Sequence, residues 1–382
     1  MNEETVFTPS DREYMQRALR LARQAEGRTG PNPMVGCVIV RDGEIVGEGF
    51  HHKAGTPHAE LHALAAAENR AQGATAYVTL EPCSHYGRTP PCADALIRAG
   101  LQKVVIAMPD PNPLVAGRGI ERLLEAGLDV KVGLMADEAG RLNEVFLKSI
   151  VTGLPFVTYK SALTLDGRIS TESGDSRWVS SPQSREASQR LRNLADVIMV
   201  GSGTVRQDNP RLTCRLPGGR DPVRLVVDGT LSLPEDAQVL SSSPSAPCII
   251  ATTAAASRDK AERLRRLRAV EVWLYETSRY VPLETLLRDL AARGWTAVLL
   301  EGGGGLAGQL LTGGLLDKIE FFLAPKFVGG NGPSPFSGFT AARMSDAVHL
   351  TGIEVSRETG DIHVTGYVSN RREHFPPGNP LF

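Results

Sequence analysis

The sequence has few cysteines, almost no net charge and no long apolar run. Its 382 residues include five cysteines, and 42 basic against 43 acidic residues leave a formal net charge of −1. A small, odd number of cysteines argues against a disulfide framework and favours a reducing, cytoplasmic location. Because there is no surplus of positive charge, the composition argues against nucleic acid as a partner and favours a small molecule.

The sequence also lacks the apolar segments that mark export or membrane insertion. Residues 1–12 are polar, so we expect no signal peptide. No apolar run is long enough to cross a bilayer, so we expect no membrane partner. With 41% hydrophobic residues over this length, the sequence predicts two or three globular domains.

One stretch contains a histidine and two cysteines arranged as metal ligands. His58 is followed two positions later by Glu60, and Cys83 and Cys92 each follow a proline. Three protein ligands are typical of catalytic zinc, which leaves its fourth position to water, whereas structural zinc has four. Glu60 is then free to carry a proton, as in the H-x-E and P-C pattern of the zinc-dependent nucleobase deaminases.

Two other interpretations use the same residues. Buried free cysteines would need neither Glu60 nor a proline before each cysteine. A structural zinc site would need a fourth ligand, for which His85 is the nearby candidate. The insert 84–91 separates the two cysteines and contains His85 and Arg88, so we expect it to hold an anionic part of the substrate.

The first part of the chain alternates between helical and strand patterns, which predicts a three-layer α/β/α arrangement. Helices are expected after residue 10, at 59–70, at 92–98 and from about 137, and strands at 35–40, 45–47, 76–80, 104–107 and 130–132. Asp42 and Gly43 predict a hairpin turn between the first two strands. Asn32 lies between two prolines, where it either binds a ligand or caps a turn.

A domain boundary is expected near residues 152–155, where a helical segment gives way to β-rich residues. Beyond it, two strands run into glycine-containing segments, 196–204 and 297–305. Such segments can present bare amides to a phosphate, or can simply be flexible turns. Neither has the spaced glycines and acidic residue of the dinucleotide fingerprint, so we do not expect a Rossmann fold.

The stretch 58–92 resembles the deaminase half of the bifunctional riboflavin-biosynthesis deaminase/reductase, and segments at 160, 176–178, 204–215 and 301–304 resemble its reductase half. The resemblance implies a cytidine-deaminase-like α/β domain at 1–150 and a dihydrofolate-reductase-like α/β domain at 151–369, followed by a tail at 370–382. It implies zinc-dependent deamination of 2,5-diamino-6-ribosylamino-4(3H)-pyrimidinone 5′-phosphate, followed by NADPH-dependent reduction of the ribosyl group to ribityl.

The resemblance also implies which residues bind cofactors and substrates. It makes His58, Cys83 and Cys92 the ligands of Zn²⁺ and Glu60 the catalytic proton carrier. The residues expected on NADPH are Ala162, Trp178, Thr204, Asp208, Gly302, Gly303, Gly304 and Gly305. Those expected on the substrate are Asn32, Lys160, Ser176, Arg192, Leu212, Arg215 and Glu301.

Some of these roles have alternatives. Lys160 either polarises the opened sugar or is an ordinary ion-pair partner. Arg192 and Arg215 suit a ribityl phosphate, because a guanidinium can bind phosphate oxygens in bidentate fashion, although Arg192 alone is typical of a solvated helix. The alternative function is a cytidine- or tRNA-type zinc deaminase fused to a pteridine-reductase-like domain. The expected partners are a phosphorylated pyrimidine and further copies of the chain in a homo-oligomer.

Overall fold

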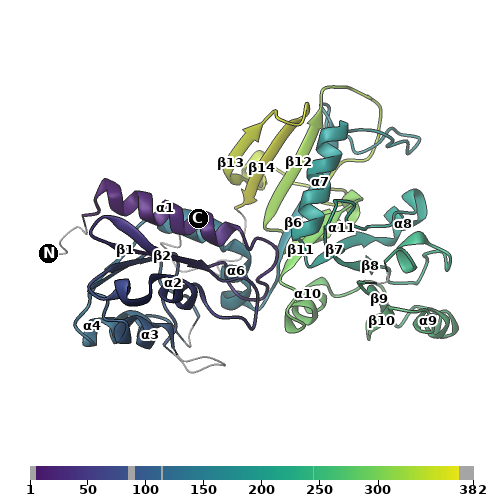
Figure 1. Cartoon of the computed structure of the whole chain (residues 1–382). Coiled ribbons are helices and arrows are strands. Elements are labelled where there is room, and N and C mark those ends of the chain that lie inside the picture. The colour runs from purple at the N-terminus through teal and green to yellow at the C-terminus, as the bar shows by residue number, and fades with distance from the viewer. Residues whose placement is uncertain (1–5, 85–90, 113–114, 244, 370–382) are drawn as a thin grey trace. The chain divides into compact units, whose positions relative to one another are not determined.

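The computed structural model describes residues 6–84, 91–112, 115–243 and 245–369, which form two compact units (Figure 1). The first unit ends at Gly153 and the second begins at Leu154. His85, Arg88 and the expected tail at 370–382 lie outside the described residues. No helix in the described ranges combines the length and the apolar character needed to cross a membrane.

The first unit is a five-stranded sheet between two layers of helices, in the strand order β2-β1-β3-β4-β5. Strands β1 and β2 form the expected antiparallel hairpin, and β3, β4 and β5 are parallel. Helices α1, α5 and α6 contribute to the core on one face, and α2, α3 and α4 to the core on the other (Figure 1). The three-layer sandwich expected from the sequence is therefore confirmed. Its elements are α1 (Pro9–Arg23), β1 (Gly36–Arg41), β2 (Glu44–Phe50), α2 (Ala59–Ala67), β3 (Thr75–Val78), α3 (Cys92–Arg98), β4 (Lys103–Ile106), α4 (Arg118–Glu125), β5 (Asp129–Val132), α5 (Ala136–Leu142) and α6 (Glu144–Thr152).

Helix α1 begins earlier than the sequence suggested. Its N-cap is Thr8, and a capping box joins Thr8 and Asp11, each side chain bonding to the other residue's main chain. The Asp11 carboxylate also accepts a 2.6 Å hydrogen bond from the Tyr77 hydroxyl on β3. Asp11 therefore lies inside the helix and not before it.

Helix α2 packs unusually close to strand β2 because small residues face each other. Ala59 and Ala63 are fully buried, and a Cβ placed on Gly47 or Gly49 would come within 2.5 Å of a carbonyl oxygen of α2. This approach is available only to glycine. It fixes the start of α2, where His58 and Glu60 lie.

The second unit is a nine-stranded sheet in the order β10-β9-β8-β7-β11-β6-β12-β14-β13. Strands from β10 to β12 in this order are parallel, and β14 and β13 add an antiparallel edge. This is not the Rossmann order, as expected. Its strands are β6 (Phe156–Thr164), β7 (Val197–Gly201), β8 (Val223–Val227), β9 (Cys248–Thr253), β10 (Val270–Tyr275), β11 (Ala297–Glu301), β12 (Lys318–Ala324), β13 (Leu350–Ser356) and β14 (Ile362–Val368).

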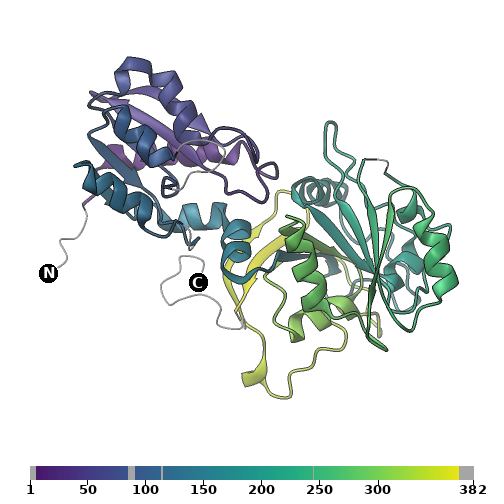
Figure 2. The same ribbon diagram turned by 90° about the horizontal axis from the view of Figure 1, so that it is seen from below.

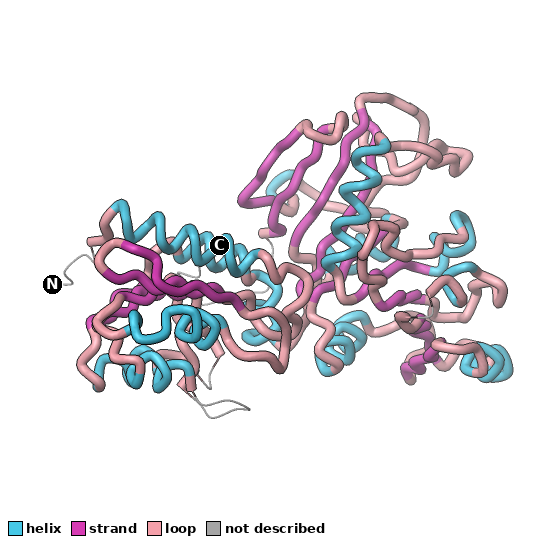
Figure 3. Tube along the Cα trace, in the orientation of Figure 1, coloured by secondary structure: helices cyan, strands magenta, loops and turns pink. Residues whose placement is uncertain are grey.

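Helices lie on both faces of this second sheet (Figure 2). They are α7 (Pro182–Leu194), α8 (Ser202–Asp208), α9 (Arg258–Arg265), α10 (Leu283–Ala292) and α11 (Gly304–Thr312). The sequence suggested a glycine turn at 201–204, but α8 begins directly at Ser202. At the outer edge, β13 is exposed along most of its length (Figure 3).

Candidate functional site

The structure brings His58, Cys83 and Cys92 together as the sequence predicted. The Nδ1 atom of His58 lies 3.6 Å from the Cys83 sulfur and 3.3 Å from the Cys92 sulfur, and the three ligand atoms all lie within 4.8 Å of one another. Tetrahedral zinc with Zn–N of about 2.1 Å and Zn–S of about 2.3 Å needs separations of roughly 3.6 Å. The donor set and its spacing therefore fit zinc.

Two helix starts and one loop hold this cluster. His58 is the N-cap residue of α2, and Cys92 is the first residue of α3. Cys83 follows β3, and its sulfur accepts a 3.4 Å hydrogen bond from the Cys92 amide. Helix amino termini favour negative charge, so both helix starts stabilise thiolate ligands.

The two cysteine side chains lie close enough to change each other's pKa. The hydrogen bond from Cys92 lowers the pKa of Cys83, and the same contact raises the pKa of Cys92. The two sulfurs and the His58 ring nitrogen are thus close enough together to bind one cation.

Glu60 lies beside the cluster without being one of its close ligands. Its side chain is 3% exposed in the first turn of α2. Burial raises the pKa of Glu60 to about 7, and the nearby Cys83 sulfur adds to the rise. A carboxyl group with this pKa can accept and release a proton near neutral pH, which suits a general acid and base.

Glu81 is a site residue to which the sequence interpretation gave no role. Its buried carboxylate accepts four backbone hydrogen bonds, from Asp110, Gly117, Gly119 and Ile120, at 2.8 to 3.3 Å. These bonds tie the segment before Cys83 to the start of α4. The only sequence signal was an acidic residue directly before the Pro-Cys pair.

In the second unit, the structure places three of the predicted substrate residues in one polar group. Arg192 on α7 forms a bidentate ion pair with Glu301 at the end of β11, with distances of 2.8 and 2.7 Å. Lys160 on β6 is the register partner of Glu301. Burial opposes ionisation of Glu301, but Arg192 overrides it and lowers the pKa of Glu301 to about 2. Burial lowers the pKa of Lys160.

The ion pair with Glu301 affects whether the Arg192 guanidinium is available to bind a phosphate. All three nitrogens of the Arg192 guanidinium are engaged, two by Glu301 and one by the Thr213 carbonyl at 3.0 Å. A bidentate phosphate contact by Arg192 would require breaking this pair. Arg215 is exposed and makes no ion pair with any described residue, so it is the freer guanidinium.

The expected cofactor turn lies between β11 and α11. The Thr204 hydroxyl, on α8, accepts a 3.1 Å hydrogen bond from the Gly303 amide. Gly302 has a φ of +114°, and a Cβ there would lie 2.5 Å from the Thr204 hydroxyl oxygen. A Cβ on Gly305 would meet nothing within 4 Å, so the turn leaves open backbone for a phosphate.

The remaining predicted residues have mixed surroundings. Trp178 is 65% exposed and lies under the Arg185 guanidinium, 4.5 Å from the ring centre. Ser176 and Asp208 are half-buried, and the Arg177 side chain donates to the Asp208 carbonyl. Ala162 lies on β6. The Leu212 side chain is buried in the core, so only its main chain can contact a substrate.

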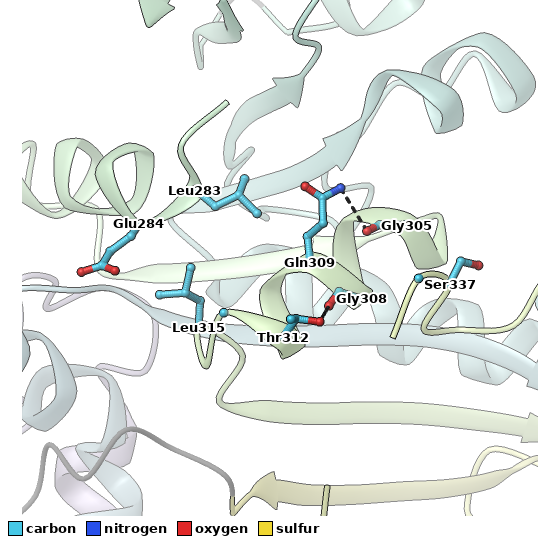
Figure 4. A pocket seen from close by; sticks show the side chains of 10 residues that line it. Leu283, Glu284, Gly305, Gly308, Gln309, Thr312, Leu315 and Ser337 are labelled. Carbon is cyan, nitrogen blue, oxygen red and sulfur yellow. Dashed lines mark hydrogen bonds between the residues drawn. The ribbon is translucent and has the colours of Figure 1, made fainter. Parts of the chain in front are cut away.

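Figure 4 shows the residues that line a hollow beside α11. Neither Arg192 nor Glu301 is among them. The hollow runs between Leu283 and Glu284 of α10 and the exposed side of α11. Two of its polar side chains bond within α11, Gln309 to the Gly305 carbonyl and Thr312 to the Gly308 carbonyl, and Glu284 accepts from Arg288. The hollow touches the cofactor turn only at Gly305 and offers few free polar groups.

Comparisons with known protein families match both units. Residues 8–108 match the cytidine and deoxycytidylate deaminase zinc-binding region, and residues 155–364 match the RibD C-terminal domain. Riboflavin biosynthesis protein RibD of Escherichia coli is 45% identical over 371 residues, covering 93% of this chain and 99% of that protein. The same protein of Bacillus amyloliquefaciens is 45% identical over 354 residues, covering 92% and 95%.

Solved structures give the same result. Acinetobacter baumannii RibD superposes with a TM-score of 0.82 at 38% identity, covering 94% of this chain and 99% of that chain. A diaminohydroxyphosphoribosylaminopyrimidine deaminase/5-amino-6-(5-phosphoribosylamino)uracil reductase from Thermotoga maritima gives 0.81 at 36% identity, with the same coverage. Because single relatives cover both units, a cytidine- or tRNA-type deaminase fused to a pteridine-reductase-like domain is not favoured.

Proposed function

The chain belongs to the RibD family and is a bifunctional deaminase and reductase, and on that premise we propose which unit and which residues perform each reaction. The unit that ends at Gly153 removes the pyrimidine amino group of 2,5-diamino-6-ribosylamino-4(3H)-pyrimidinone 5′-phosphate. The unit that begins at Leu154 then reduces the ribosyl group of the deaminated product to ribityl. The division between Gly153 and Leu154 lies three residues after the division at residue 150 that the sequence suggested.

The placement of buried Glu60 beside the three metal-ligand side chains carries the first assignment. Zinc, when bound by His58, Cys83 and Cys92, lowers the pKa of water to about 7 and so makes hydroxide available at neutral pH. Glu60 accepts a proton from the attacking water and delivers a proton to the amino group as it leaves as ammonia. Burial keeps bulk water from competing for this carboxyl group.

The reductase assignment depends on the polar group at the ends of β6 and β11. NADPH, when bound at the turn 302–305 and at Thr204, supplies the hydride. Glu301 and Lys160 face the sugar, and the lowered pKa of Lys160 makes its ammonium a better proton donor to the opened sugar oxygen. Arg192 fixes the Glu301 carboxylate, and Arg215 binds the substrate phosphate.

The chain is further proposed to be cytoplasmic and to form a homo-oligomer. None of its five cysteines is in a disulfide, which suits a reducing compartment. Strand β13 is one edge of the nine-stranded sheet, with Ile353 57% and Val355 61% exposed and no lysine or proline. Such an edge pairs readily with another strand, and a second copy provides an identical one.

One experiment tests the proposed function directly. The zinc-loaded protein is incubated with the diaminopyrimidine phosphate, with and without NADPH, while ammonia and NADPH are measured. We expect ammonia release in both samples and NADPH oxidation only after deamination. Release of ammonia from cytidine or tRNA but not from this pyrimidine would contradict the proposal.

A further inference from the structure

The loop that carries Asn32 is fixed by the surrounding main chain. The main-chain N–H of Asn32 donates a hydrogen bond to the Thr29 carbonyl oxygen at 2.9 Å. The next residue but one, Met34, is bound twice by the buried Asn143 side chain, which accepts from the Met34 amide at 2.8 Å and donates to its carbonyl at 3.0 Å. The position of the Asn32 side chain is therefore determined by the fold.

His51 is buried between this loop and the metal-ligand cluster. His51 follows directly after β2 and is 3% exposed. Its ring contacts the His58 ring edge-on, with the ring centres 5.4 Å apart. Its Nδ1 atom lies 3.2 Å from the Pro57 carbonyl oxygen. Because a carbonyl oxygen can only accept, Nδ1 must carry a hydrogen.

The second ring nitrogen of His51 then decides the orientation of Asn32. In a neutral ring with hydrogen on Nδ1, Nε2 has only a lone pair and must accept. The Asn32 amide nitrogen lies 3.1 Å from Nε2 and supplies that hydrogen bond. The amide oxygen of Asn32 consequently points away from His51, and no described residue donates a hydrogen bond to it.

From this geometry we propose that His51 is a positioning residue that holds the Asn32 amide oxygen as a hydrogen-bond acceptor for the pyrimidine. The donor it selects is a ring N–H, of the kind that a pyrimidinone carries beside its amino-bearing carbon. The inference rests on the proposed deaminase function. It also explains why this histidine, one side chain away from the cluster, is not among the metal ligands.

The test begins with the tautomer, which needs no substrate. Long-range proton–nitrogen NMR on the zinc-loaded, full-length protein with labelled histidine is expected to show the hydrogen of His51 on Nδ1 and none on Nε2. A hydrogen on Nε2 would overturn the proposal, because Asn32 would then have to turn its oxygen towards His51.

Kinetics test the consequence for substrate binding. His51→Leu removes the acceptor and should raise KM for the diaminopyrimidine phosphate about tenfold, with kcat within about twofold and zinc content unchanged. In His51→Gln, the side-chain oxygen can replace Nε2, so KM should stay near the wild-type value. His52→Leu is the matched control, because His52 is exposed and its ring stacks on Phe50.

Two kinetic outcomes would overturn the proposal. Loss of zinc from a folded His51→Leu protein would make His51 a support of the metal site, and an unchanged KM would show that Asn32 needs no fixed orientation. If the wild-type protein released no ammonia from this pyrimidine, the proposed function would fail, and the NMR result would still decide how Asn32 is oriented.

Discussion

Glu60 and Glu301 are both buried carboxyl groups, yet their neighbours change their pKa in opposite directions. Burial and the Cys83 sulfur both disfavour charge on Glu60, whose pKa is about 7. Burial also disfavours charge on Glu301, but the bidentate Arg192 outweighs it and the pKa falls to about 2. The first group is suited to exchanging a proton, and the second is a permanent anion at neutral pH.

Glu60→Gln keeps the shape of the side chain but removes its ability to accept a proton. Ammonia release should fall by roughly 10²- to 10⁴-fold, because general acid–base catalysis is lost. Zinc measured by elemental analysis should persist, and NADPH oxidation with the deaminated pyrimidine should be normal. Glu68→Gln, at an exposed position just beyond α2, is the control. Loss of zinc would show instead that Glu60 is a ligand.

Glu301→Gln should make the stability of the second unit less dependent on pH. The lowered pKa of Glu301 stabilises the folded wild type above about pH 4.5, and this contribution is lost as pH falls towards about 2. At pH 7 the variant should be less stable by on the order of 3 kcal/mol, and the difference should vanish near pH 2.

Tryptophan fluorescence can measure the stability of the second unit separately from that of the first. Trp178, Trp273 and Trp295 all belong to the second unit, so denaturant unfolding followed by their fluorescence reports that unit alone. Glu276→Gln, at an exposed position, is the control and should show no such dependence. A difference between Glu301→Gln and wild type that stayed constant down to pH 2 would exclude the ion pair as its source.

At the scale of elements, the turn between β11 and α11 has two glycines with different constraints. Gly302 needs its positive φ and lies against Thr204, so a side chain there would strain the fold. Gly303 has a φ of −65°, and a Cβ there would be 3.7 Å from the Thr204 hydroxyl oxygen, an ordinary contact. Of these two glycines, Gly303 is therefore the one at which a side chain can affect cofactor binding without straining the fold.

Gly303→Ala should leave thermal unfolding almost unchanged while weakening NADPH binding. The added methyl group would occupy the space that a phosphate needs to reach the backbone amides. Calorimetric titration of NADPH into the full-length protein measures this, and we expect the Kd to rise about tenfold or more, a change of roughly 1.4 kcal/mol. An unchanged Kd in a folded variant would place the phosphates elsewhere.

At the scale of the whole molecule, each unit has its own sheet and its own site. The candidate metal ligands His58, Cys83 and Cys92 lie before Gly153, and the Arg192–Glu301 ion pair lies after Leu154. Variants in one site are therefore expected to leave the other reaction intact. The edge strand β13 of the second sheet is exposed along most of its length.

Ile353→Lys should shift the protein to a smaller assembly. A lysine on an edge strand opposes pairing with another strand, because the charge would have to be buried between the two copies. Light scattering coupled to size-exclusion chromatography measures the mass, with Leu274→Lys, on an exposed position of β10, as the control. If the Ile353→Lys protein kept its wild-type mass, oligomers would form through another surface.

The sequence by itself pointed to the residues of the His58, Cys83 and Cys92 cluster and to a deaminase-like part followed by a reductase part. His58 and Glu60 at the start of α2 and Cys92 at the start of α3 belong to short motifs in which local sequence decides geometry, and Cys83 lies in the loop after β3. Alternating helical and strand patterns also predicted the sandwich of the first unit. Helix limits were less accurate, because capping at Thr8 and the direct start of α8 depend on single hydrogen bonds and on packing.

Only the tertiary structure decided which distant side chains meet. Arg192 and Glu301 are 109 positions apart, as are Met34 and Asn143, and Glu81 reaches amides 29 to 39 positions away. Strand order and register set these contacts, and neither is encoded in the local periodicity of the chain. The fold therefore pairs Arg192 with Glu301 and brings the ring of His51 to the side chain of Asn32.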